Sequence, residues 1–262
     1  MEQQFLTIDQ IWVASTLILA PFIGSFIGLL TLRLPADRPW VMSRSACDTC
    51  KRPLGIVDLL PVISFLILRG RCRNCHAAIP LRYLLLEVGC LLIALWSAII
   101  YPGAMVLVTA LLGWSLLLIA TIDAEHLWLP DKLTLPLGAL GVLFTIGVGQ
   151  APLWTPLLGA IVGYGVLASV AWLYKSLRGF EGMGGGDPRL MGAIGAWVGW
   201  QGVPSVLVWS CVAGLSFAIA QAIVHRRFSS RQPLPFGTFL AIGGWLTWLW
   251  GPLHTLLAWN SF

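Results

Sequence analysis

Two acidic residues border apolar segments of the chain. Asp123 directly follows the apolar run at 104–122, and Asp187 opens another run after four glycines, which are Gly182, Gly184, Gly185 and Gly186. An ionisable side chain placed against an apolar segment is costly, so both acids are candidates for function. Glycines allow positive φ angles and close backbone approach, which a loop needs if a peptide is to pass an acid without meeting side chains.

Both acids also have an ordinary structural interpretation. Asp187 precedes Pro188, and Asp followed by Pro suits the N-cap and first positions of a helix. Helix cap and catalytic acid therefore stay open as alternatives for Asp187 from its local sequence. For Asp123 the functional interpretation is favoured, and a solvated residue at a helix end is the alternative. For Asp131, which precedes Lys132 and a new apolar run, an N-cap is the favoured interpretation.

Two Cys-x-x-Cys pairs lie in the largest polar segment, residues 35–82. They are Cys47 with Cys50 and Cys72 with Cys75, separated by 21 residues. Four thiolates with this spacing predict a closed, structural Zn²⁺ site, and a redox-active pair is the weaker alternative. A segment of this length has little hydrophobic core of its own, so a metal ion would stabilise it.

The composition is that of an integral membrane protein. Of the 262 residues, 58% are hydrophobic and 10% are charged, whereas soluble domains carry about 25% charged residues. The 16 Lys and Arg residues exceed the 11 Asp and Glu residues, but they are scattered between apolar runs and form no continuous basic face. This pattern excludes nucleic acid as a partner and predicts membrane lipid as the surroundings.

Apolar windows long enough to cross a bilayer core of about 30 Å lie near 11–34, 83–101, 104–122, 132–150, 154–174, 203–225 and 236–258, with a shorter run at 190–200. If the short run also crosses, every Lys and Arg falls on one side, which the positive-inside bias places in the cytosol. The sequence therefore predicts an all-α polytopic membrane protein of about eight transmembrane helices. The cytosol keeps thiols reduced, so this placement of the cysteines also argues against disulfides.

We expect three parts along the chain: a first transmembrane helix at 1–34, a cytosolic zinc-binding loop domain at 35–82 and a seven-helix core at 83–262. In this arrangement Asp123 and Asp187 both lie at cytosolic ends of helices. Two carboxylates that share a proton can hydrolyse a peptide, because the ionised one takes a proton from water while the protonated one polarises the carbonyl. Helix polarity favours the charge on Asp187 and the proton on Asp123.

Two other classes of function compete with a peptidase. An ion-coupled transporter predicts acids near the middle of spans, but Asp123 and Asp187 lie at boundaries. A zinc-stapled membrane scaffold accounts for the cysteines and leaves the glycine loop unexplained.

The sequence resembles the bacterial type IV prepilin leader peptidases, membrane aspartic proteases of the GxGD class. The resemblance rests on the Gly182–Asp187 run, the Ile-Asp-Ala-Glu-His stretch around Asp123, both Cys pairs and Gly24-Ser25-Phe26. It implies that Asp123 and Asp187 are the catalytic pair, facing the cytosol from a bacterial inner membrane. It also implies cleavage of basic leaders from type IV prepilins or type II secretion pseudopilins after a glycine.

The resemblance further implies methylation of the new N-terminal amine by S-adenosylmethionine, in the region around Gly70. Three residues depart from the family pattern: Gly28 stands where Asn is usual, Arg189 where Lys is usual, and Pro188 is uncommon at its position. Arg keeps the charge of Lys without its compactness. These departures bear on methyl transfer more than on cleavage. Neither the oligomeric state nor the particular pilin follows from the sequence.

Overall fold

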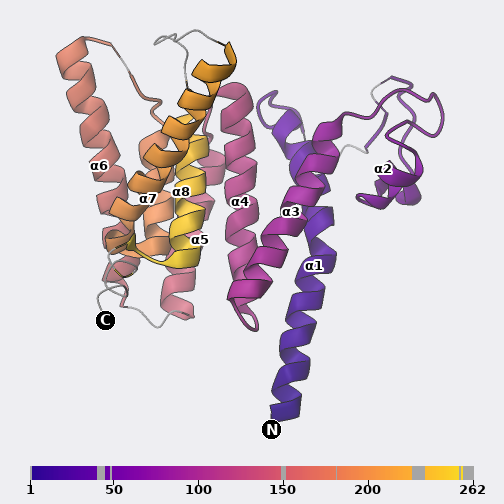
Figure 1. Cartoon of the computed structure of the whole chain (residues 1–262), viewed down its shortest axis with the longest axis horizontal. Helices are drawn as coiled ribbons and strands as arrows, with labels where there is room; N and C mark the ends of the chain where they lie inside the picture. Colours follow the sequence, from indigo (N-terminus) through magenta and orange to yellow (C-terminus); the bar gives the residue numbers. More distant parts are fainter. Residues whose placement is uncertain are drawn as a thin grey trace. The chain divides into compact units, whose positions relative to one another are not determined.

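The computed structural model describes residues 2–39, 45–47, 49–148, 152–180, 182–225, 234–253 and 255. Its elements, labelled in Figure 1, are α1 (Glu2–Arg33), η1 (Ile56–Leu59), α2 (Ile63–Ile67), α3 (Leu81–Ile100), α4 (Met105–His126), α5 (Asp131–Gly147), α6 (Trp154–Arg178), α7 (Asp187–His225) and α8 (Phe236–Trp250). Outside the helices, the described residues contain only two isolated β-bridges. The predicted all-α class is confirmed.

Within the part of the chain that the structure describes, five helices are long and apolar enough to cross a membrane: Ile8–Arg33, Leu81–Ile100, Met105–His126, Trp154–Arg178 and Gly186–Val224. The shorter helices α5 and α8 have 17 and 15 residues. The molecule is thus a multi-pass membrane protein, as its composition predicts.

The chain divides into two compact units, Met1–Leu118 and Ile119–Phe262. In the first unit α1 packs against α3. A Cβ atom at Gly24 would lie 2.5 Å from Cα of Glu87, so the bare backbone of Gly24 is what permits the close crossing. Near the start of α3, Arg82 donates a hydrogen bond of 2.7 Å to the hydroxyl of Thr31.

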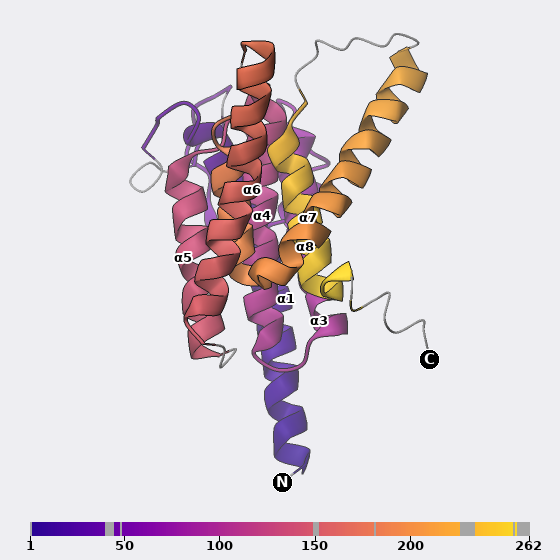
Figure 2. The same ribbon diagram turned by 90° about the vertical axis from the view of Figure 1, so that its left-hand side faces the viewer.

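In the second unit, α7 consists of two helical segments joined at Gly199, whose φ of 70° and ψ of 170° are not helical. Figure 2 shows the chain turning between these segments. The glycines of α8 locate the turn, because Gly244 packs against Ile194 of the first segment and Gly243 packs against Ser210 of the second. With the two segments counted separately, the long helices coincide with the eight apolar windows of the sequence.

Glycines bring α6 and the first segment of α7 into backbone contact. A Cβ atom at Gly159 would collide with the carbonyl oxygen of Gly195, and one at Gly163 would lie 2.5 Å from the carbonyl oxygen of Met191. Small residues at such crossings allow the van der Waals contact that holds membrane helices together. This packing fixes the segment that begins at Asp187.

We predict that Gly159→Leu destabilises the protein, because its side chain must displace the backbone of α7. Overpacking of this kind costs about 1–3 kcal/mol or more. Gly165→Leu is the matched control on the same helix, since a Cβ atom there would meet nothing within 4 Å. Thermal unfolding in detergent measures the difference, and equal melting temperatures for the two variants would contradict the packing.

Candidate active site and metal centre

Asp123 lies in the last turn of α4 with its side chain directed at the beginning of α8. It is 4% exposed, and its Oδ2 accepts a hydrogen bond of 2.7 Å from the backbone N–H of Thr238. The Thr238 hydroxyl is 3.2 Å from the same oxygen and 2.9 Å from the carbonyl oxygen of Ala120. A hydroxyl has one proton to donate, so it serves one of these acceptors at a time.

Asp187 is the first residue of α7 and is 5% exposed. Its backbone N–H donates to the carbonyl oxygen of Gly184 at 3.2 Å. The carboxylates of Asp187 and Asp123 are near enough for their charges to interact. The structure therefore brings together, within one unit, two buried acids that are 64 residues apart in the sequence.

Leu129 lies between the beginnings of α7 and α8, close to the two acids. A Cβ atom at Gly186 would lie 2.6 Å from Cβ of Leu129, and one at Gly237 would lie 2.8 Å from Cδ1 of Leu129 and 3.0 Å from Cγ of Asp123. Leu129 is itself 9% exposed. The beginnings of α7 and α8 can both approach this side chain because each has a glycine there.

The glycine loop does not use positive φ angles. Among the described glycines, those with positive φ are Gly70, Gly103, Gly179, Gly199 and Gly251, so this part of the prediction for Gly182, Gly184, Gly185 and Gly186 is wrong. Close approach is confirmed, because Gly182 packs on the ring of Tyr174 and Gly186 packs on Leu129. Gly185 is open, since a Cβ atom there would meet nothing within 4 Å.

Helix polarity does not separate the two acids as the sequence predicts. Asp187 does begin a helix, and Asp123 is near the C-terminal end of one. However, Asp123 also receives a backbone N–H from the first turn of α8, whose positive end therefore acts on it. Both carboxylates thus lie at helix N-termini, and the charge and the proton cannot be assigned from helix direction alone.

The predicted N-cap role of Asp131 is wrong. The N-cap of α5 is Pro130, and no side chain caps this helix. The carboxylate of Asp131 instead accepts bonds of 2.6 and 2.7 Å from Arg189, in the first turn of α7. This ion pair connects the beginnings of α5 and α7, and the sequence pattern has no signal for it because the partners are 58 residues apart.

The four predicted metal ligands meet at one point of the first unit. The Sγ atoms of Cys47, Cys50, Cys72 and Cys75 all lie within 4.8 Å of one another and can hold a metal ion. The Sγ atoms of Cys47 and Cys75 are 3.8 Å apart, and all four thiols are free.

The two cysteine pairs have the same backbone geometry. The backbone N–H of Cys47 donates to the carbonyl oxygen of Arg52, and that of Lys51 donates to the carbonyl oxygen of Cys47. In the second pair, the N–H of Cys72 donates to the carbonyl oxygen of Ala77, and that of His76 donates to the carbonyl oxygen of Cys72. Lys51 and His76 also share a positive φ, of 56° and 57°. The exposed His76 thus corresponds to a lysine and is not a member of the thiol cluster.

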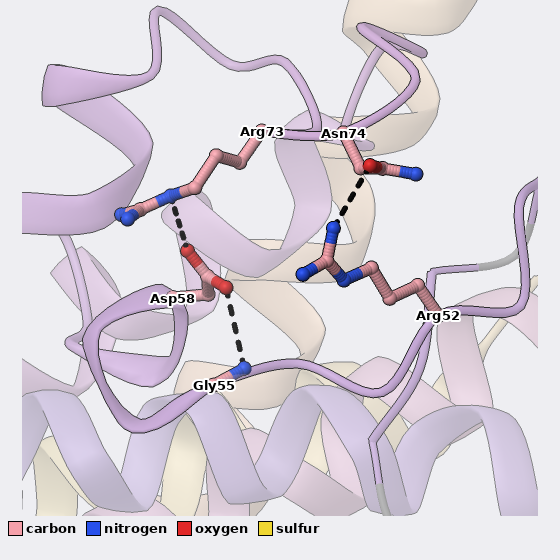
Figure 3. Close-up of polar contacts among 5 residues, drawn as sticks. All are labelled: Arg52, Gly55, Asp58, Arg73 and Asn74. Carbon is pink, nitrogen blue, oxygen red and sulfur yellow. Dashed lines mark hydrogen bonds and ion pairs between the residues drawn. The ribbon is translucent and has the colours of Figure 1, made fainter.

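Side chains outside the cluster join the two pairs and the helical turn between them. Arg52 donates to Oδ1 of Asn74 at 2.9 Å, and Arg73 forms an ion pair of 2.9 Å with Asp58 (Figure 3). Asp58 in turn accepts the N–H of Gly55 at 3.2 Å. These contacts place η1 against the second cysteine pair.

Backbone N–H groups favour the thiolate form of three of the cysteines. They lower the pKa of Cys47, Cys50 and Cys72 through the amides of Cys50, Arg52 and Cys75 respectively. For Cys75 the amide of Ala77 acts in the same direction, but burial and the neighbouring thiols raise its pKa to about 11. A metal ion binding here displaces the proton of Cys75 at neutral pH.

Gly70 lies in the first unit beside α2. Its φ is +67°, and a Cβ atom there would lie 2.9 Å from the ring of Phe65. The N–H of Gly70 donates to the carbonyl oxygen of Phe65 at 2.8 Å. Gly70 therefore lies in the turn that follows α2 (Ile63–Ile67), in a conformation that suits glycine.

Comparison with known proteins agrees with this geometry. The model of the type IV leader peptidase family matches residues 110–219, and the bacterial peptidase A24 N-terminal domain matches residues 18–101. The chain belongs to the type IV leader peptidase family. The first match contains both buried aspartates, and the second contains all four cysteines of the cluster.

Similar proteins cover nearly the same length. A prepilin leader peptidase/N-methyltransferase of Aeromonas salmonicida is 40% identical over 258 residues, with 87% of each chain covered. The protein of the same name from Aeromonas hydrophila is 39% identical over 254 residues with the same coverage. That from Pseudomonas aeruginosa is 36% identical over 272 residues, covering 92% of this chain and 91% of its own. No solved structure matches the chain significantly.

Gly237 and Thr238 are the residues that sequence reasoning missed. Their signal is the Pro235-Phe236-Gly237-Thr238 stretch at the beginning of the last apolar window, where a glycine and a hydroxyl residue stand at a helix N-terminus. Without the fold, nothing in that stretch indicates Asp123 as its partner.

We predict that Thr238→Val slows peptide cleavage by about threefold to tenfold, the effect of one hydrogen bond, because it removes the hydroxyl and keeps the N–H. Thr238→Ser, which keeps both donors, should be close to wild type. Gly237→Val should slow cleavage by about a hundredfold, because the valine side chain would displace the carboxylate of Asp123 from its fixed position. Single-turnover cleavage in detergent measures all three, and wild-type rates for Gly237→Val would contradict this placement of Asp123.

Proposed function

We propose that the chain is a membrane-embedded aspartic endopeptidase that removes the basic leader of type IV prepilins or type II secretion pseudopilins after a glycine. The observation that carries this proposal is the pair of buried, mutually interacting carboxylates of Asp123 and Asp187 in a chain of this family. We place the active site at the cytosolic face of the bacterial inner membrane, because Lys and Arg residues gather on that side of the expected spans.

In this proposal the two carboxylates share one proton. The ionised carboxylate takes a proton from a water molecule, whose oxygen attacks the scissile carbonyl carbon. The protonated carboxylic acid donates to the carbonyl oxygen, and the tetrahedral intermediate then releases the amine as it receives a proton. Thr238 orients the carboxylate of Asp123 for this proton transfer, and the packing of α6 against α7 holds Asp187 opposite Asp123.

The substrate reaches the acids along the glycine loop. Gly184 has Oδ2 of Asp187 as its nearest neighbour, 3.4 Å from a Cβ atom placed there, and Gly185 has no neighbour within 4 Å. An extended peptide can therefore lie against the backbone of these residues. The helix-terminal position of both acids also favours a peptidase over a transporter, for which acids deeper in the helices are expected.

The second proposed activity is N-methylation of the new terminus from S-adenosylmethionine, which the names of the relatives support. We assign it to the first unit, in the region around Gly70 and the segment 35–82, which we propose as a loop domain between the first helix and the seven-helix core. S-adenosylmethionine would supply the methyl group. The residues of this region would position the donor and the amine.

Zn²⁺ is the metal that the thiol cluster fits best. Zn–S bonds of about 2.3 Å in a tetrahedron place the sulfur atoms about 3.8 Å apart, and the Sγ atoms of Cys47 and Cys75 are 3.8 Å apart. Four protein ligands leave no position for water or substrate, so the role of this ion is structural. It would join the two cysteine pairs and order the chain between them.

We predict that Asp123→Asn and Asp187→Asn each abolish leader cleavage, by at least about a thousandfold, because each removes one partner of a proton-sharing pair. Glu125→Gln is the matched control, an exposed acid in the same turn as Asp123. Cleavage of a purified prepilin in detergent measures the rates. The proposal is wrong if either Asn variant cleaves as fast as wild type.

A separate prediction concerns the metal. Purified protein should contain one Zn²⁺ per chain, and Cys50→Ser should lower the occupancy and disorder residues 45–79 more than the membrane helices. Cys211→Ser, which changes an exposed cysteine outside the cluster, should keep full occupancy. Elemental analysis and limited proteolysis provide the two readouts. Native protein that holds no metal and has two disulfides in this segment would contradict a zinc site.

A further inference from the structure

An apolar surface is exposed on the helical turns between the two cysteine pairs. In α2, the side chains of Ile63, Leu66 and Ile67 are 55%, 63% and 71% exposed, and this helix has no buried residue. Val57 and Leu59 of the adjoining η1 are exposed as well. Contiguous exposed apolar side chains outside a membrane span indicate an interaction surface.

A hydrogen bond to a buried carboxylate fixes the position of this surface along α3. The N–H of Val62, directly before α2, donates to Oε2 of Glu87 at 2.7 Å. Glu87 is 6% exposed and lies six residues into α3, which is about 9 Å along the helix axis. Val62 has a φ of 61°, unusual for a β-branched residue. The bond to Glu87 keeps the beginning of α2 close to α3 (Leu81–Ile100), one of the helices that are long and apolar enough to cross a membrane, and near the end at which that helix begins.

Positive charge predominates in the segment of the chain that carries this surface. Residues 35–82 contain eight basic and three acidic residues, so with neutral thiols this segment carries the whole formal net charge of +5. Four thiolates around a divalent ion would still leave it at +3. Arg52 and Arg73 have protein partners (Figure 3). Arg69 and Arg71, just after α2, are exposed and form no side-chain bond with the residues that the structure describes.

The charge decides which partner fits. A basic leader peptide would be repelled by this segment, so the leader is not its partner. A membrane leaflet with anionic headgroups matches both features, because apolar side chains enter the acyl boundary while arginines remain among the phosphates. The short distance from α2 to a membrane-spanning helix makes that leaflet the nearest partner.

We propose that η1 and α2 form a docking surface, comprising Val57, Leu59, Ile63, Leu66 and Ile67 with Arg69 and Arg71, that binds the anionic phospholipid leaflet next to α3. The hydrogen bond between Val62 and Glu87 would hold this surface at a fixed depth relative to the leaflet. The cysteine pairs are thereby oriented against the membrane surface. This inference goes beyond the proposed function and is independent of both activities.

A photoreactive benzoylphenylalanine at Ile67 tests the partner in the full-length protein. The protein is placed in nanodiscs of phosphatidylcholine with phosphatidylglycerol, and Thr49 in the first cysteine pair is the control position. We expect lipid adducts at position 67 and none at position 49. Adducts to residues 119–262 of the same chain, to a second copy or to an added prepilin would overturn the proposal and identify the true partner.

Hydrogen exchange of residues 57–71 tests the role of charge. We expect slower exchange in discs that contain phosphatidylglycerol than in phosphatidylcholine alone, and high salt should reduce the difference. The double variant Arg69→Gln, Arg71→Gln should reduce the protection by about 25-fold, about fivefold for each charge removed near an anionic surface. Arg178→Gln, an exposed base at the end of α6, is the control. Equal exchange in both kinds of disc would overturn the proposal.

Discussion

Burial of carboxylates in an apolar helical bundle is the constraint on which the rest of the second unit depends. A charged side chain in such surroundings is tolerated only where hydrogen bonds replace its water. Asp123 obtains one from the first turn of α8, and Asp187 begins its own helix. Three helix ends must therefore meet at one place, and Gly186 and Gly237 make room for them around Leu129.

The turn in α7 follows from the same constraint. The first segment must begin at the acids and pack along α6 and α8, and its length is limited by the non-helical Gly199. Glycine contacts with α6 hold this segment so closely that Asp187 has little freedom. Rigidity of this kind suits a proton-sharing pair, whose chemistry requires fixed geometry before the substrate arrives.

Composition and apolar periodicity were sufficient to predict the helical class and the eight long segments, because both depend on residues close in the sequence. The cysteine cluster was predicted from the spacing of its two Cys-x-x-Cys pairs. The order of the spans placed Asp123 and Asp187 on segments that could meet, but spacing alone did not show that they do, because this depends on how α7 and α8 pack around Leu129. The Asp131–Arg189 ion pair and the contact of Thr238 with Asp123 could not be predicted, since they depend on how α5 and α8 pack against distant segments. In the glycine loop, close approach holds at Gly182 and Gly186, whereas positive φ angles do not occur there.

The two cysteine pairs are built alike and are only weakly joined to each other. Apart from the thiols, the side-chain hydrogen bond described between them is the exposed contact of Arg52 with Asn74, which contributes about 0.5–1.5 kcal/mol at most. For a metal ion bound by the four thiols, as we propose, ordering of the segment and binding of the ion would therefore be a single equilibrium. By reciprocity, a partner that binds the ordered segment would then increase its affinity for the ion, and a shortage of the ion would weaken the other contacts that the segment makes.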